Sequence, residues 1–199
     1  MTTAWDLMIV TRDGAGGPVD PDDLSLALAG AELLDLMEAG AASLDGDRIV
    51  PGLPTSTRDA LLDQAAGSLQ RERPHESVGA WLWRRGERLS SAYLAGLETE
   101  GYAVRARHRW VPIRSDDPSL VDSPAREHAA ERWASGEPVL SVLAAAAGVP
   151  DREPDVAGHL PDDVTTVLAA VGNAVTELEA VRQRRRVEQQ AFDNIWRAP

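Results

Sequence analysis

Apolar residues recur at helical spacing along most of this chain. The densest case lies between Asp22 and about Ala39, where leucines cover much of the circumference and predict a buried helix. Six further helices are predicted, over 57–70, 76–85, 87–100, 124–134, 139–147 and 161–196. Pro21-Asp22-Asp23 and Ser123-Pro124 are helix start signals, because acids and proline suit the first helical turn.

Two short hairpins interrupt the helices. The first joins strands near 42–44 and 48–50 through Asp45-Gly46-Asp47, a strong turn signal. The second is predicted over Tyr102–Arg114. Residues 2–12 form a short apolar stretch followed by a turn-rich loop, and 150–160 is a polar internal linker before the long helix of 161–197. The pattern favours a mostly α, compact single-domain helical bundle over residues 1–199, with small β-hairpins at its edge.

Composition narrows the function classes. The chain has 199 residues, 43% hydrophobic, and no cysteine, which excludes disulfides, thiolate nucleophiles and cysteine-ligated metals. Its beginning lacks the basic and apolar regions of a secretory signal. The apolar stretch 139–149 is shorter than the roughly 18–20 residues that a spanning helix needs. We therefore expect a cytoplasmic protein that can touch the inner membrane surface without crossing it.

Candidate catalytic and metal sites are weak. The glycine-rich loop 13–18 lacks the spacing of a phosphate-binding loop. Glu127, His128 and Glu131 share a helix face but need another ligand to hold a metal. The acid pairs Asp22–Asp23 and Asp162–Asp163 follow prolines at helix starts, where negative charge interacts favourably with the helix dipole. No enzyme activity, metal or cofactor is expected.

Charge is distributed unevenly. The chain carries a net charge of −12, and all twenty of its basic residues, Arg182 to Arg186 among them, are arginine, a bias typical of a GC-rich bacterial genome. Residues 84–114 nevertheless hold seven arginines and three acids, a local +4 that leaves −16 for the remainder. This asymmetry favours a docking face for an anionic partner. The candidate binding residues are Arg84, Arg85, Arg88, Arg105, Arg107, Arg109 and Trp110.

Several segments occur in a recognisable order. They are 7–10 with the Asp13-Gly14 turn, 26–36, the hairpin 42–50, 61–65, 78–81, and 94–101 with the hairpin behind it. Together they resemble the Golgi phosphoprotein 3 family, most strongly over residues 5 to about 115. The resemblance implies a non-enzymatic, mostly helical domain that binds phosphatidylinositol 4-phosphate at a basic membrane-facing surface. In that family a hairpin helps insertion or self-association, and the adaptors also grip short protein tails.

The family's headgroup pocket is matched only in part. Asp20 and Ala29 stand where the family has a tryptophan and an arginine, and Glu87 and Ser90 where it has two basic residues. Arg85 and Arg88 keep the spacing of that basic pair but lie two residues earlier. A general attraction to anionic lipid therefore survives better than selectivity for one headgroup.

Three functions follow from these patterns. The first is peripheral binding of anionic phospholipid, with Arg85 and Arg88 on phosphate, the hairpin arginines attracting at range and Trp110 at the interface. The second is nucleic-acid binding by a winged-helix arrangement, which the acids Glu98 and Glu100 disfavour. The third is a module for a protein client or a homo-oligomer, with 164–196 as its contact surface.

Overall fold

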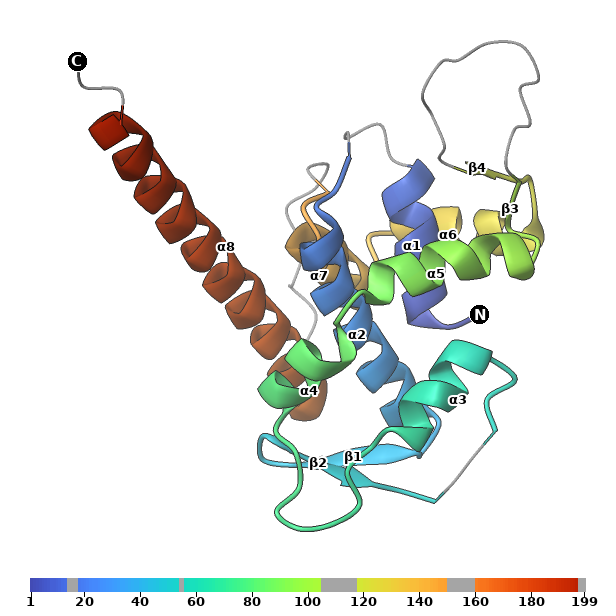
Figure 1. The fold of residues 1–199 in the computed structure, drawn as a ribbon. Helices are drawn as coiled ribbons and strands as arrows, with labels where there is room; N and C mark the ends of the chain where they lie inside the picture. Colours follow the sequence, from blue (N-terminus) through green and yellow to red (C-terminus); the bar gives the residue numbers. More distant parts are fainter. Residues whose placement is uncertain (14–17, 54–55, 105–117, 150–159, 197–199) are drawn as a thin grey trace.

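The computed structural model describes residues 1–13, 18–53, 56–104, 118–149 and 160–196. These form a single compact, mostly helical domain with two small antiparallel sheets (Figure 1). The helices are α1 (Thr3–Asp13), α2 (Pro21–Glu38), α3 (Ala60–Gly67), α4 (Val78–Arg85), α5 (Leu89–Thr99), α6 (Pro124–Ala134), α7 (Pro138–Ala146) and α8 (Asp162–Trp196). The strands are β1 (Ala42–Asp45), β2 (Arg48–Pro51), β3 (Ala103–Val104) and β4 (Ser119–Leu120).

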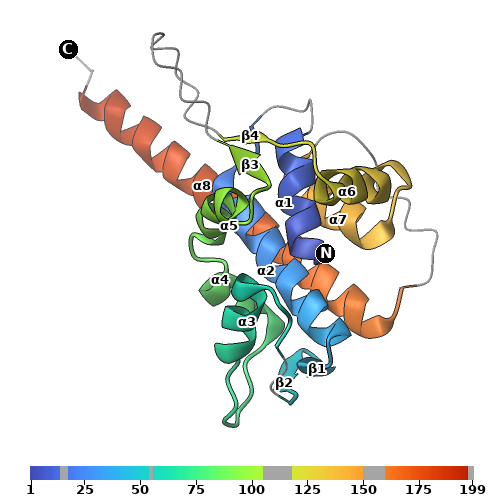
Figure 2. The ribbon, with the colours of Figure 1, turned by 90° about the vertical axis from the view of Figure 1, so that its right-hand side faces the viewer.

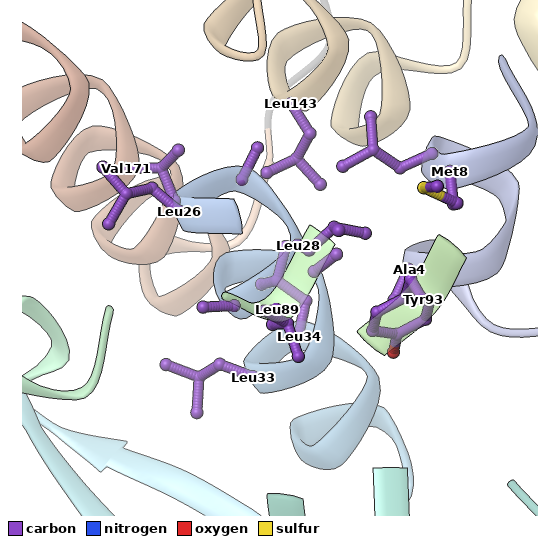
Figure 3. Packing of buried hydrophobic residues seen from close by; sticks show 14 of the residues in the cluster. Ala4, Met8, Leu26, Leu28, Leu33, Leu34, Leu89, Tyr93, Leu143 and Val171 are labelled. Atoms are coloured by element: carbon purple, nitrogen blue, oxygen red, sulfur yellow. The ribbon is translucent and has the colours of Figure 1, made fainter. Parts of the chain in front are cut away.

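Helix α2 is the centre of the core. Its residues from Leu24 to Leu36 are all buried, because α1, α4, α5, α7 and α8 pack around it. Figure 3 labels side chains of α2 together with others from α1, α5, α7 and α8 that belong to the same buried cluster. Small residues allow the close approach: a Cβ added at Gly30 would collide with Cγ2 of Val171 on α8. The leucine-rich pattern of this segment correctly predicted a buried helix.

Helix α8 has two unlike halves. Val167, Val171 and Ala174 are buried against the bundle, whereas residues 183–190 are exposed. Figures 1 and 2 agree that the C-terminal half leaves the body of the domain. Within 162–190 this helix is also long and apolar enough to cross a membrane by length and composition alone. Among the described helices, α8 and not 139–149 is therefore the one long enough for this test, and 22% of its apolar window is buried inside the domain.

The hairpins differ in how well the sequence located them. Strands β1 and β2 pair as expected around the Asp45–Arg48 turn, from Ala42 opposite Pro51 inward. The second hairpin is wider than predicted, because β3 pairs with residues 119–120 and not with a strand ending at Arg114. Two-residue strands are too short to give an alternating pattern, so the sequence carried little signal for this return strand.

One helix lies where the sequence predicted none, and local backbone conformation moves the starts of two others. Residues 3–13, expected as a short apolar stretch, form α1, in which nine consecutive residues are buried. Helix α3 begins at Ala60 because Asp59 caps it and Arg58 is left-handed, at φ 63°. Helix α5 begins at Leu89 because Arg88 is left-handed as well, at φ 58°. The caps and positive φ values decide these starts, and periodicity does not reveal them.

Candidate anion- and lipid-binding site

Arg84 lies in the last turn of α4 and has a local partner. Its Nε and Nη2 donate to the two carboxylate oxygens of Glu76 at 2.8 and 2.7 Å, and Nη2 also donates to the Ser68 carbonyl at 3.1 Å. Its guanidinium stands 5.2 Å from the ring centroid of Trp81. The bond to Glu76 raises the pKa of Arg84. The Arg84 side chain keeps 45% of its surface exposed, whereas that of Glu76 is only 9% exposed, so this arginine holds a largely buried carboxylate.

Arg85 points inward instead. Its Nε and Nη2 donate to Oε2 and Oε1 of Glu32 at 2.7 and 2.9 Å, and further bonds reach Gln64 and the Leu61 carbonyl. Tyr93 donates its hydroxyl to Glu32 at 3.1 Å. Burial raises the pKa of Glu32, and the bonds from Arg85 oppose that shift. The guanidinium predicted to hold phosphate is thus bound to a fully buried carboxylate.

Arg88 is exposed, like Arg84. It forms the left-handed corner between α4 and α5, and Gly86 beside it packs against the Ser25 carbonyl of α2. Across the described ranges, no carboxylate or carbonyl pairs with the Arg88 side chain. Of the α4–α5 arginines, it is the best placed to meet an external anion.

Helix α5 separates this corner from the hairpin. Eleven residues at 1.5 Å each put Arg88 and β3 about 16 Å apart along the helix axis (Figure 1). Arg105, Arg107, Arg109 and Trp110 lie outside the described residues. Of the predicted binding residues, the structure therefore describes Arg84, Arg85 and Arg88, which all precede α5.

A cleft that the sequence did not predict lies at the first of these ends. It has a volume of about 740 Å³ and forms between the end of α1, the start of α2 and the start of α5. Its walls are Met8, Thr11, Arg12, Pro18, Val19, Pro21, Leu24, Ser90, Ser91 and Leu94. These described residues include one cation, three hydroxyls and six apolar side chains, but no carboxylate. The sequence carried no signal for this cleft, because its lining residues lie in segments far apart along the chain.

A buried hydroxyl pair joins two walls of the cleft. Ser25 Oγ lies 2.9 Å from Ser90 Oγ, and the Ser90 backbone N–H donates to Ser25 Oγ at 3.0 Å. Ser25 Oγ also lies 2.6 Å from the Pro21 carbonyl oxygen. Since these bonds link α2 to α5, the start of α5 is fixed relative to the start of α2. Ser90, at a matched pocket position, is thus used inside the protein.

Acids at the start of α2 are met by α8. Asp20 caps the helix by accepting from the Asp22 N–H at 2.9 Å, so the cap is one residue before the proline and not at Asp22–Asp23. Arg182 of α8 donates to Asp20 at 2.5 Å and to Asp23 at 2.8 Å. Burial raises the pKa of Asp23, and Arg182 opposes that shift. Arg182 therefore joins α8 to the start of α2 by ion pairs.

Two other sequence features have structural roles. Ala29, at the other matched position, is fully buried, and its carbonyl accepts from the Trp81 indole at 3.0 Å. His128 Nε2 lies 3.6 Å from Asp6, a buried acid on α1 that also accepts from Arg132. In the part of the chain that the structure describes, no three acids or histidines converge as metal ligands.

Comparison with known proteins agrees with the resemblance. The model of the family described as Golgi phosphoprotein 3 (GPP34) matches residues 6–197, which is nearly the whole chain. A search of curated proteins found no match. The family match extends through α6, α7 and α8, where the sequence alone showed similarity only in helical character.

Proposed function

Because this chain belongs to the Golgi phosphoprotein 3 family, known for binding phosphatidylinositol 4-phosphate at membranes, we propose that it binds anionic lipid peripherally. Family members are generally adaptors without enzymatic activity, and we assign none here. The proposed location is the cytoplasmic face of a membrane. The partner is an anionic phospholipid surface.

The observation that carries this proposal is the exposed Arg88 beside a cleft with no carboxylate among its described lining residues. On a protein of net charge −12, the described walls of the cleft contain Arg12 and no carboxylate. Arg88 is exposed and precedes the lining residues Ser90 and Ser91 by two and three positions. On so acidic a protein, a cleft whose described walls carry an arginine and no carboxylate supports an anionic partner.

The roles of the predicted arginines divide accordingly. Arg88 is proposed to contact lipid phosphate, and the partly exposed Arg84 is proposed to add positive charge at the surface of α4 while it stays bonded to Glu76. Arg85 is proposed to act from inside, by fixing α4 on α2 through Glu32. Arg105, Arg107, Arg109 and Trp110, which lie outside the described residues, remain proposed as further lipid contacts. Near an anionic leaflet each basic residue contributes about 1 kcal/mol, so the binding is salt-sensitive.

Vesicle flotation tests the proposal. The protein should float with vesicles rich in anionic phospholipid at low salt, less so at moderate salt, and should not float with neutral vesicles. Arg88→Glu should weaken flotation, and replacing Arg105, Arg107 and Arg109 with glutamate should weaken it further. Arg73→Glu is a control with the same charge change, because Arg73 is exposed in the loop before α4. Equal flotation with anionic and neutral vesicles would contradict the proposal.

Self-association through α8 is a second candidate, favoured by one observation. Val187 and Phe192 are 59% and 63% exposed on the half of α8 that leaves the body. A helical segment without tertiary packing gains little stability from its own hydrogen bonds. A second copy of the chain that packs against this half of α8 would stabilise it. Light scattering should show fewer protomers per particle for a chain truncated after Arg182, which keeps the ion pair with Asp20. An unchanged number of protomers per particle would exclude this surface.

A further inference from the structure

The face of α8 that packs on the bundle continues beyond the bundle. Val167, Val171 and Ala174 are buried, and they follow one another at spacings of four and three residues. The same alternation then passes through the half-buried Leu178 and Val181. Spacings that alternate between three and four residues keep positions on one face of a helix, as in the contact face of a coiled coil. Continued outward, the alternation reaches positions 185, 188 and 192.

The outer part of this face has apolar ends and a charged centre. We call positions 181, 185, 188 and 192 the outer stripe. Val181 is half-buried at its inner end, and Phe192 is 63% exposed at its outer end, on the half of α8 that leaves the body (Figures 1 and 2). Arg185 and Glu188 lie between them and are both exposed. Among the residues that the structure describes, neither of these two charges has an ion-pair partner, although other α8 arginines do.

The outer stripe is symmetric about its centre. The midpoint between Arg185 and Glu188 along the sequence is also the midpoint between Val181 and Phe192. Two copies of α8 that lie antiparallel with these midpoints aligned therefore bring Arg185 of each copy opposite Glu188 of the other. The same alignment brings Val181 of each copy opposite Phe192 of the other. Every contact occurs twice, as a two-fold interface requires.

A second copy complements the outer stripe better than a lipid surface does. An anionic surface would attract Arg185 but repel Glu188 on the same helix face. An antiparallel second copy gives each of these charges its opposite. A parallel copy would instead set arginine against arginine and glutamate against glutamate. Polar groups at the contact positions of paired helices specify direction and register in this way, at some cost in stability.

We propose that two copies of this chain pair through α8, antiparallel along the outer stripe, with Arg185 of each copy facing Glu188 of the other. The inference rests on the self-association candidate above and gives it a partner, a direction and a register. It is independent of the membrane proposal, because the outer stripe and the α4–α5 corner share no residue.

Mixing two charge variants tests this register. Arg185→Glu leaves two acids on the outer stripe, and Glu188→Arg leaves two arginines. In sedimentation over a range of concentrations, each variant alone should dimerise at least about tenfold more weakly than the unchanged protein, because like charges then face each other. An equimolar mixture of the two should recover a dimer within about threefold of the unchanged affinity, since every facing pair is again of opposite charge.

Arg186→Glu is the matched control. It makes the same charge change at an exposed position about 100° around the helix from position 185, away from the outer stripe. Its dimer should stay within about threefold of the unchanged affinity. Circular dichroism checks that all three variants are folded. Weakening by Arg186→Glu equal to that by Arg185→Glu would overturn the inference, because net charge and not register would then set the association.

The outcomes separate this inference from both candidate functions. An unchanged protein that stays monomeric, or a mixture no more associated than its components, would overturn the inference. If truncation after Arg182 still dissociates the particles in the second case, α8 self-association stands with another register. Charge variants that alter flotation with anionic vesicles and leave association unchanged would assign the outer stripe to lipid and also overturn it. Recovery in the mixture supports the inference whether or not vesicles float the protein.

Discussion

The bond between Arg85 and Glu32 gives the sharpest prediction about stability. Glu32 is fully buried, Arg85 is 11% exposed, and two hydrogen bonds of 2.7 and 2.9 Å join them. Removing one member of such a pair costs about 3–5 kcal/mol, because the other charge stays buried without compensation. We expect Arg85→Met to lower the free energy of unfolding by about 3 kcal/mol, since Glu32 can escape part of the cost by taking up a proton.

The midpoint of thermal unfolding should then fall by about 10 °C, at roughly 2–4 °C per kcal/mol for a domain of this size. Urea unfolding followed by circular dichroism measures the change directly. The double variant Glu32→Gln/Arg85→Met is the control, because it removes both charges and keeps an acceptor for Tyr93. It should recover most of the loss.

A loss below about 1 kcal/mol in Arg85→Met, or a double variant no better than the single one, would refute this reasoning. Flotation separates the two roles considered for this arginine. At a temperature where Arg85→Met is folded, its binding to anionic vesicles should match that of the unchanged protein. Lost flotation with unchanged stability would instead make Arg85 a lipid ligand.

Three further predictions concern other parts of the fold. Burial raises the pKa of Asp35 to about 6, so the folded state holds the proton of this carboxyl more tightly than the unfolded state does. The resulting stabilisation is fully present below about pH 3.8 and is lost as the pH rises to about 6, by up to about 3 kcal/mol. Urea unfolding at pH 4, 5 and 6 should therefore show a free energy of unfolding whose Asp35-dependent fall with pH is absent in Asp35→Asn. Gly30→Ala should lower the free energy of unfolding by about 1–3 kcal/mol through collision with Val171, and Val171→Ala in the same chain should restore part of it. Arg182→Met should release α8 from Asp20, and hydrogen exchange should quicken in residues 178–186, whereas unchanged exchange would show that apolar packing alone holds the helix.

The sequence predicted what depends on periodicity. The helical positions of α2 and the Asp45-Gly46 turn of the first hairpin were readable because each is a local pattern with a known geometry. Helix α1 was missed because nine consecutive buried residues, polar ones included, leave no alternation between faces. The starts of α3 and α5 were displaced because left-handed residues set them.

The candidate site was less predictable because it depends on which charges meet in space. The sequence shows seven arginines between 84 and 114, but not that Arg84 faces Glu76 and Arg85 faces Glu32. Neither partner lies three or four residues from its arginine, the spacing at which side chains of one helix pair. The cleft was invisible for the same reason, since Arg12 and Ser91 line it from segments far apart along the chain.

The central claim, that this member of the Golgi phosphoprotein 3 family binds anionic lipid through the α4–α5 corner, is tested most directly by flotation of Arg88→Glu beside Arg73→Glu. Both variants should be run at low salt with vesicles of anionic and of neutral phospholipid. The account predicts that the unchanged protein and Arg73→Glu float with anionic vesicles alone and that Arg88→Glu floats less. Equal flotation of the two variants, or flotation indifferent to lipid charge, would contradict it.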